Sequence, residues 1–318
     1  MEEANKIITE IEQEEQRLGK KLLKFYNKNY KLLLLIPLIL LIFSLGYIGY
    51  FYSKNQDFIK RDVSLTGGTT ITIFSEQEIN IEDLTSTLAQ EIDDFNIREL
   101  SDFRTGKQEA VIVEIPIEDT SSEEYKTIVS LLEDSLGTTL IRGENFDIVS
   151  TGSTLGTSFY KQLQFAILIS FILMAIVVFI IFRTFAPSIA VVLSAFADIV
   201  MTLALVDLLG IRVSSAGIIA FLMLIGYSVD TDIMLTTRLL KRQGQINTKL
   251  KDAFKTGITM TITSIIALSV ALVITQSFSP VLKQIFTILL IGLGFDILNT
   301  WITNASILKW YLERRDRE

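Results

Sequence analysis

Six long apolar runs constrain this chain more than any other feature of its sequence. A helix needs about 20 mostly apolar residues to cross roughly 30 Å of hydrocarbon. The runs cover residues 32–52, 163–182, 187–209, 213–235, 256–276 and 281–311. Because each run is long enough to span a bilayer, the sequence predicts a polytopic α-helical membrane protein with six spans.

The positions of the runs divide the chain into five parts. Residues 1–31 are predicted as an amphipathic segment, 32–52 as the first span, 53–160 as an external domain, 161–311 as a five-helix bundle and 312–318 as a tail. The first part has apolar residues at helical spacing among Glu, Gln and Lys. This segment would lie on the membrane surface, remain solvated or bind a partner.

The basic residues predict the orientation of the spans. If the chain starts in the cytoplasm, the clusters at 20–31, 183, 238–255 and 313–317 all fall on the cytoplasmic side. This distribution follows the positive-inside rule. We therefore expect a multi-pass plasma-membrane protein with both termini cytoplasmic and residues 53–160 extracytoplasmic. A cleaved signal peptide is the alternative for the first run, but the acidic leader and the lack of a small-residue cleavage site argue against it.

The external segment has the pattern of a soluble α+β domain. Alternating strand patterns and helical periods give the order β-α-β-β-α-β, which is typical of the ferredoxin-like split fold. Gly67 and Gly68 precede the first strand and predict a tight turn where the chain enters the sheet. Residues 55–160 contain 21 acidic and 7 basic side chains, so this surface does not suit nucleic-acid binding.

Missing residue types exclude several kinds of chemistry. The chain contains no Cys and no His, so it has no disulfide, no thiolate nucleophile and no Cys or His metal site. It also lacks a phosphate loop, a nucleophile elbow and a zinc motif. The sequence therefore predicts neither an enzyme nor a metal or cofactor, and any proton carrier must be Asp, Glu, Lys or Tyr.

Two carboxylates lie inside the fourth run. An ionised Asp at the centre of a span costs roughly 2.5–3.5 kcal/mol, so Asp230 and Asp232 indicate a function or a hydrogen bond to a neighbouring span. On a helix they point about 200° apart, so at most one faces a given neighbour. We expect the deeper Asp230 to be the functional group. Asp232 shares a face with Ser228 and Thr236 and would support it from nearer the cytoplasmic end.

Other polar residues in or beside the spans are candidates for the same network. Lys255 heads the fifth run, where it would either extend to the membrane surface or pair with Asp230 inside the bundle. Asp198, Asp296 and Asn299 lie within apolar runs and predict polar support inside the bundle. The sequence thus predicts Asp230, Asp232 and Lys255 as the ion-coupling residues.

Several motifs resemble the archaeal branch of the SecF family of Sec translocase subunits. They are Gly226-Tyr-Ser-Val229 with Ile233 and Arg238, the run Val229-Asp-Thr-Asp-Ile233, and the stretch Asp296-Ile-Leu-Asn-Thr-Trp301. The resemblance covers nearly the whole chain. It implies an RND-like half-transporter that pairs with SecD, works with the Sec translocon channel on unfolded exported polypeptide in the lipid bilayer, and uses proton or sodium flow.

Two positions depart from the bacterial pattern of that family. Bacterial members have Asn-Asp-Ser where this chain has Asp230-Thr231-Asp232, which puts Asp230 where SecD has its acidic residue. Lys255 stands where bacterial relatives have Arg. Half of an RND-like small-molecule exporter and a purely structural subunit remain the alternative functions.

Overall fold

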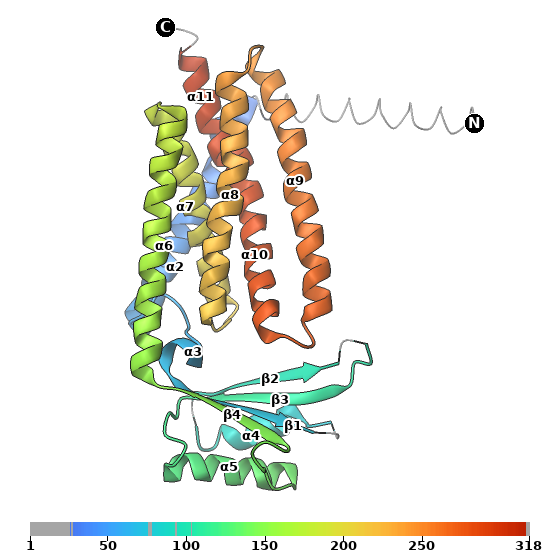
Figure 1. Cartoon of the computed structure of the whole chain (residues 1–318). Coiled ribbons are helices and arrows are strands. Elements are labelled where there is room, and N and C mark those ends of the chain that lie inside the picture. The colour runs from blue at the N-terminus through green and yellow to red at the C-terminus, as the bar shows by residue number, and fades with distance from the viewer. Residues whose placement is uncertain (1–25, 27, 76–77, 93, 103, 316–318) are drawn as a thin grey trace, which may run out of the picture.

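The computed structural model describes Tyr26 and residues 28–75, 78–92, 94–102 and 104–315. Most of the predicted amphipathic segment 1–31 and the last residues of the predicted tail 312–318 lie outside these ranges. Within them the chain forms a tall helical bundle with a small α+β domain at one end (Figure 1).

The described residues contain six helical stretches that are long and apolar enough to cross a membrane. Five of them consist of α2 (Leu35–Asn55) with the turn before it, α6 (Ser153–Phe182), α7 (Phe185–Leu208), α8 (Ser215–Lys241) and α9 (Ile246–Thr275). The sixth joins α10 (Pro280–Leu298), the π-helical turn η1 (Asn299–Asn304) and α11 (Ala305–Arg315). The prediction of six spans agrees with these helices.

Local sequence signals explain where two spans begin. The Ser214 side chain accepts a hydrogen bond from the backbone N–H of Gly217, and Ser279 does the same for Leu282. These serines cap α8 and α10, and Pro280 fits the first turn of α10 because that position needs no N–H donor. Two helices are longer than the apolar runs that predicted them. α6 starts at Ser153 and therefore includes the end of the predicted external domain, and α9 starts at Ile246.

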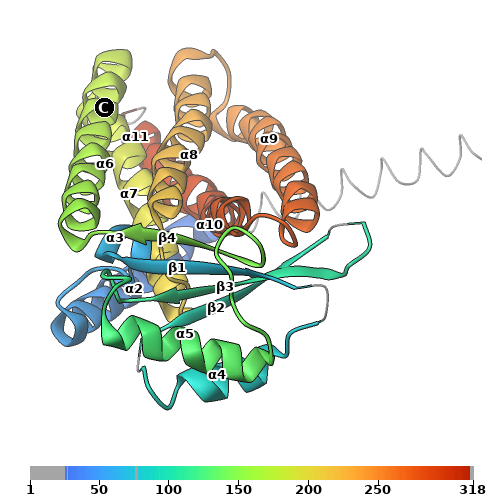
Figure 2. The ribbon, with the colours of Figure 1, turned by 60° about the horizontal axis from the view of Figure 1, so that its bottom comes forward.

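Spans α7 and α8 form the centre of the bundle, with α2, α6 and α9 around them (Figures 1 and 2). Small residues such as Ala195 allow α7 to pack closely against its neighbours. One apolar cluster joins Val178 of α6, Val191 of α7 and Ile225 of α8. This arrangement buries the middle of α7 and α8, where the polar residues of the spans lie.

The α+β domain is a four-stranded sheet with two helices on the face away from the spans (Figures 1 and 2). Its elements are α3 (Val63–Thr66), β1 (Gly68–Phe74), α4 (Ile81–Leu88), β2 (Asn96–Ser101), β3 (Gln108–Ile115), α5 (Glu123–Leu136) and β4 (Phe146–Thr151). The sheet is antiparallel in the order β2-β3-β1-β4, with Ile71 opposite Val113 and Ile148. Ile71, Val113 and Leu132 belong to its core.

Two glycines carry the chain from α3 into the sheet. Gly67 has φ 90° and Gly68 has φ 140°, backbone conformations that side chains disfavour. A Cβ on Gly67 would lie 2.5 Å from backbone atoms of Ser153, the first residue of α6. The glycine pair therefore provides a sharp turn and a close contact between the domain entry and the second span.

Hydrogen bonds fix the domain against the ends of the spans. The Arg212 guanidinium, between α7 and α8, forms an ion pair with Asp94 at 2.5 Å and donates to the Phe95 carbonyl at 3.0 Å. At the other end of the domain, the backbone N–H of Ser101 donates to the carbonyl of Ser277 at 2.6 Å. The α+β domain is thus attached at two separate loops of the bundle.

Candidate functional site

Three aspartates from three different elements meet inside the bundle. Asp198 comes from α7, Asp232 from α8 and Asp296 from α10, and each is 0% exposed. We refer to these three residues as the aspartate cluster. Their burial is unusual because a carboxylate in hydrocarbon loses its water without gaining a solvent of similar polarity.

The carboxyl group of Asp198 has a neutral donor on each oxygen. The hydroxyl of Ser228 donates to Oδ2 at 2.6 Å, and the side-chain amide of Asn299 donates to Oδ1 at 2.7 Å. Ser228 lies on α8 and Asn299 on η1, so Asp198 joins the fourth and sixth spans to the third. Both of its oxygens are therefore satisfied without an ionised partner.

A single hydroxyl connects the other two carboxyl groups. Thr300 Oγ1 lies 2.8 Å from Oδ1 of Asp232 and 3.0 Å from Oδ1 of Asp296. A threonine hydroxyl has one hydrogen, so it can donate fully to only one of these oxygens. The other contact is a good hydrogen bond only when that carboxyl carries a proton and donates to Thr300. The geometry thus suits a pair of carboxyls that hold a proton between them.

The π-helical turn η1 supplies most of the groups that bind the aspartate cluster. The Asn304 amide also donates to Oδ1 of Asp232 at 2.8 Å, so Asn299, Thr300 and Asn304 each contact a cluster carboxyl. A π-helical turn inside an α-helix is rare and is frequently found at functional sites. Here it directs these three side chains toward α7, α8 and α10.

Some oxygens at the site have no hydrogen-bond partner in the described part of the chain. They are Oδ2 of Asp232, Oδ2 of Asp296 and Oδ1 of Asn304, all buried. Buried polar atoms are normally paired, so each unpaired one needs an explanation. The two carboxyl oxygens can accept a proton, and all three oxygens can bind a small cation.

No cation neutralises the aspartate cluster within the described ranges. The ion pairs found there involve other acidic residues, namely Asp57, Asp62, Asp94, Glu114, Glu123 and Glu313. An uncompensated buried charge costs several kcal/mol, and three adjacent ones would also repel each other. The carboxyl groups are therefore not all ionised in this arrangement.

Asp230 and Lys255 lie away from the aspartate cluster. Asp230 is exposed on the outer side of α8, and Lys255 is exposed near the start of α9. Among the described residues no ion pair joins them to each other or to Asp232. The two aspartates of α8 point to different sides, as their spacing requires. The geometry favours Asp232 over Asp230, because the inner face of α8 is the one with Ser228 and Thr236.

The sequence named some members of this site and missed others. Asp198, Asp296 and Asn299 are expected as polar support. Asn299 bonds to Asp198, and Asp296 is joined to Asp232 through Thr300, the residue next to Asn299. Thr300 and Asn304 were not expected as partners of Asp232. Their spacing from Asp296, at four and eight residues, is a signal that could have placed them on one helical face.

Comparisons with known proteins place these features in context. Residues 130–314 match the family model described as protein export membrane protein SecD/SecF, C-terminal. The protein-export membrane protein SecF of Methanocaldococcus jannaschii is 39% identical over 90% of this chain and 96% of its own length. Those of Methanothermobacter thermautotrophicus and Pyrococcus furiosus are 36% and 33% identical, over 91% and 94% of this chain and 94% and 97% of their own.

A solved structure has a similar fold. The crystal structure of SecDF from Thermus thermophilus, a translocon-associated membrane protein, aligns with 90% of this chain at a TM-score of 0.67 and 18% identity. A second SecDF structure, in a super-membrane-facing form, aligns with 91% at a TM-score of 0.59. This chain spans 38% and 39% of the length of those two chains.

Proposed function

This chain belongs to the SecF family of protein-export membrane proteins, and from that premise we propose that it drives export with protons carried by the aspartate cluster. Asp232 is the central carrier, and Asp198 and Asp296 are its buried neighbours. Sodium is the alternative ion, because carboxylate and amide oxygens bind it as well.

One observation carries this proposal. Three buried carboxyl groups accept hydrogen bonds from neutral side chains, and none of them contacts a cation among the described residues. A buried carboxyl group costs less free energy in the membrane when it is protonated than when it is ionised. Loading a proton therefore stabilises the buried arrangement, and releasing it leaves a charge that favours a different arrangement or a water path.

The energy of one proton is sufficient for a small movement. A unit charge that falls through 100 mV releases about 2.3 kcal/mol. That is comparable to the cost of a few hydrogen bonds, each worth about 1 kcal/mol. The α+β domain contacts the bundle through hydrogen bonds of this kind, at Arg212 and Ser101. The free energy available from one proton is thus similar to the free energy of the hydrogen bonds that would have to break.

The outer side of α8 supports pairing with SecD. Asp230 is exposed within the span, and Gly226, one turn earlier on the same face, has nothing within 4 Å of where a Cβ would lie. An ionisable side chain on a lipid-facing surface is costly, so another protein is the better cover for this face. We infer that Asp230 faces SecD, and that Lys255 supplies a positive charge at the cytoplasmic surface rather than inside the bundle.

The same proposal includes the orientation of the chain in the membrane and the role of the α+β domain. Both termini lie in the cytoplasm of a plasma-membrane protein, and the α+β domain is extracytoplasmic. Its strand order, β2-β3-β1-β4, supports a ferredoxin-like domain, and its six spans support half of an RND-like machine. The domain binds unfolded exported polypeptide or the SecD domain, beside the Sec translocon channel. It performs no catalysis and binds no cofactor or nucleic acid.

The decisive experiment compares two substitutions of the same kind on α8. In cells that depend on this protein, Asp232→Asn should slow export of a secreted reporter. Asp230→Asn, compared at equal membrane abundance and equal recovery of SecD, should export the reporter at the wild-type rate, because Asp230 lies outside the cluster. Asn fits at 232 because Oδ2 of Asp232 has no partner, so an amide nitrogen there displaces no hydrogen bond.

A direct measurement of proton movement distinguishes an effect on proton transport from an effect on protein export. Purified protein, together with SecD, would be placed in vesicles that contain a pH-sensitive dye, and an imposed voltage would drive proton entry. Asp232→Asn should abolish this entry. Normal export and normal proton entry in Asp232→Asn, Asp198→Asn and Asp296→Asn would show that the aspartates only hold the spans together, which leaves a structural subunit.

A further inference from the structure

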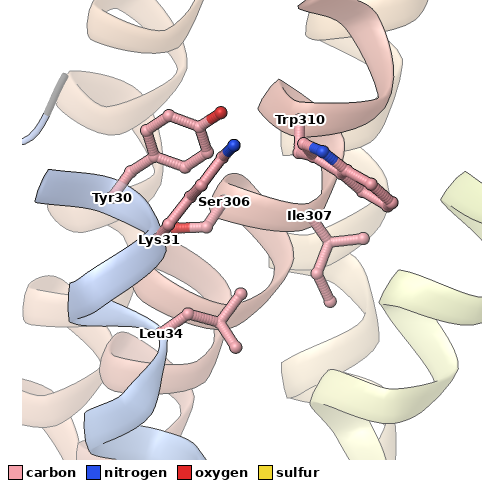
Figure 3. A pocket seen from close by; sticks show the side chains of 6 residues that line it. All are labelled: Tyr30, Lys31, Leu34, Ser306, Ile307 and Trp310. Carbon is pink, nitrogen blue, oxygen red and sulfur yellow. The ribbon is translucent and has the colours of Figure 1, made fainter. Parts of the chain in front are cut away.

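A small open pocket lies at the end of the bundle opposite the α+β domain. It has a volume of about 220 Å³ and is formed between the start of the first span and α11. Its lining consists of Tyr30, Lys31, Leu34, Ser306, Ile307 and Trp310 (Figure 3). We refer to it as the α2–α11 pocket. It shares no lining residue with the aspartate cluster.

The α2–α11 pocket is polar at one end and apolar at the other. Figure 3 shows the ammonium of Lys31 and the indole nitrogen of Trp310 at the same level of the cavity, on opposite walls. Leu34 is one turn further into the membrane than Lys31 on the first span. Ile307 is likewise one turn deeper than Trp310, because α11 runs in the opposite direction. Hydrogen-bond donors therefore lie at the membrane surface, and aliphatic side chains lie below them.

The nearby carboxylate is already neutralised. Glu313 accepts a hydrogen bond from the Tyr30 hydroxyl at 2.8 Å and pairs with Lys309 at 3.8 Å. Lys309 is buried and lies 4.9 Å from the centre of the Tyr30 ring and 5.6 Å from that of Tyr26. The charge of Glu313 is thus balanced by Lys309, and among the residues that the structure describes the charge that faces the cavity is positive.

That positive charge comes from exposed lysines of the first span. Lys31 is exposed, and its ammonium lies 5.9 Å from the centre of the Tyr30 ring. Lys28, three residues earlier, is also exposed and shares the same helical face. A ligand in the α2–α11 pocket therefore meets the ammonium of Lys31 and the indole N–H of Trp310, and the exposed Lys28 adds a second positive charge beside the pocket.

We propose that the α2–α11 pocket binds the phosphate headgroup of an anionic phospholipid, whose chains lie along Leu34 and Ile307. Lys and Trp residues concentrate where spans meet the membrane surface, and basic pockets between spans bind anionic headgroups. The volume corresponds to about seven waters at ~30 Å³ each, which is room for a phosphate group. It is below the ~300–1,000 Å³ that is typical of sites for whole small-molecule ligands.

The charge distribution also selects among lipids. A zwitterionic headgroup brings its own cation, which would lie beside Lys31 and Lys28. An anionic headgroup brings only the phosphate and neutral groups, so it gains both lysines. The site is therefore specific for net negative lipids and not for phosphodiesters in general.

Native mass spectrometry of the purified full chain tests this inference. Phosphatidylglycerol and phosphatidylcholine with identical chains would be titrated separately, and the affinity of the first bound lipid compared. The wild type should prefer phosphatidylglycerol by fivefold or more. Lys31→Gln should weaken phosphatidylglycerol binding about fivefold, the value expected for one lysine near an anionic surface. Trp310→Phe, which keeps the ring but removes the N–H, should weaken it about threefold.

The matched control is Lys54→Gln, an exposed lysine at the other end of α2 and outside the pocket. It should bind both lipids as the wild type does. Equal affinity of the wild type for the two lipids, or equal losses in Lys31→Gln and Lys54→Gln, would overturn the proposal. So would displacement of the lipid by millimolar inorganic phosphate, because a lipid also gains the apolar contacts with Leu34 and Ile307.

Discussion

The side-chain amide of Asn299 lies 2.7 Å from Oδ1 of Asp198, and this hydrogen bond joins the π-helical turn of the sixth span to the third span. The other end of the same turn holds Asp232 through Asn304. Two carboxyls on different spans are therefore held by one short segment. A change in the charge of either carboxyl acts on that segment first, and this gives the aspartate cluster a structural means of affecting its surroundings.

Replacing Thr300 by Val should slow protein export about tenfold at normal membrane abundance. The hydroxyl that connects Asp232 and Asp296 is lost while the branched shape of the side chain is kept. A hydrogen bond to a charged group is worth about 1.5–3 kcal/mol, and about 1.4 kcal/mol corresponds to tenfold in rate. Thr300→Ser should retain export. Thr263→Val is the control, because the Thr263 hydroxyl bonds only to carbonyls of its own helix. Equal export by both Val variants would contradict the bridging role.

Replacing Asp198 by Ala should lower the thermal stability of the purified protein. The substitution removes the acceptor for both Ser228 and Asn299, and each buried donor left unpaired costs about 1–3 kcal/mol. Asp198→Asn should lower the thermal stability less, because its amide oxygen can still accept a hydrogen bond from Asn299. The measurement is the unfolding temperature in detergent. A melting curve for Asp198→Ala that overlays the wild type would mean that these bonds contribute nothing to stability.

Gly292 and Gly294 offer a matched test of helix packing. A Cβ at position 292 would overlap the side chain of Leu224 on α8, whereas position 294 has nothing within 4 Å. Leu224 is fully buried, so it cannot move aside without disturbing its neighbours. Gly292→Ala should therefore destabilise the purified chain by about 1–3 kcal/mol, and Gly294→Ala should not. Similar unfolding temperatures for the two variants would show that α8 and α10 have room to separate.

Two glycines of the α+β domain offer a similar comparison of substitutions. Gly67 and Gly106 both have positive φ, 90° and 69°, but only Gly67 lies against another segment, at Ser153. Gly106→Ala should cost only the backbone strain, about 1 kcal/mol. Gly67→Ala should cost more, because the methyl group would also push α3 away from α6. Thermal unfolding of the two variants gives the comparison. A larger loss for Gly106→Ala would mean that the contact with Ser153 adjusts freely.

Stability near the start of α6 should depend on pH through Glu118. Hydrogen bonds from the backbone N–H and the hydroxyl of Ser153 hold the pKa of Glu118 below its ordinary value of 4.5. Because the folded pKa is the lower one, this stabilisation is fully present above the unfolded pKa. It is lost as the pH falls through the folded pKa.

Glu118→Gln isolates this contribution. The wild type should unfold at a higher temperature than the variant above about pH 5, and the difference should shrink as the pH is lowered below 4. Amide exchange at Ser153 and the next residues of α6 should follow the same trend. A constant difference across this pH range would indicate that Glu118 acts through something other than its charge.

The sequence was sufficient for the spans and for the order of elements in the α+β domain. The order of elements depends on periodic patterns, such as the alternation in 109–117, and the spans depend on long apolar runs, such as 163–182. Burial in the domain core and in the membrane enforces these patterns directly. Helix ends were less predictable. α6 continues back to Ser153 through polar residues, because its first turn packs against the entry to the α+β domain, where Ser153 and Gly156 lie beside Gly67.

The aspartate cluster could be predicted only in part. Spacing showed that Asp230 and Asp232 point to different sides, but the sequence alone does not reveal which side of α8 meets α7 and α10. Depth along the span therefore favoured Asp230, whereas packing placed Asp232 inside. The π-helical turn was not predictable either, since it depends on hydrogen bonds from Asn299 and Asn304 to residues far away in the chain.

The π-helical turn also fixes the rotational phase of the helix that follows it. Its hydrogen bonds run from residue i to i+5, so it accommodates one residue more than an α-helical turn. If the turn became α-helical, everything beyond Asn304 would rotate by about 100° and shift by about 1.5 Å. Lys309 would then leave the Tyr26 and Tyr30 rings, and Trp310 would leave the α2–α11 pocket. The rotation of α11 about its axis thus couples the π-helical turn inside the bundle to the side chains at the membrane surface.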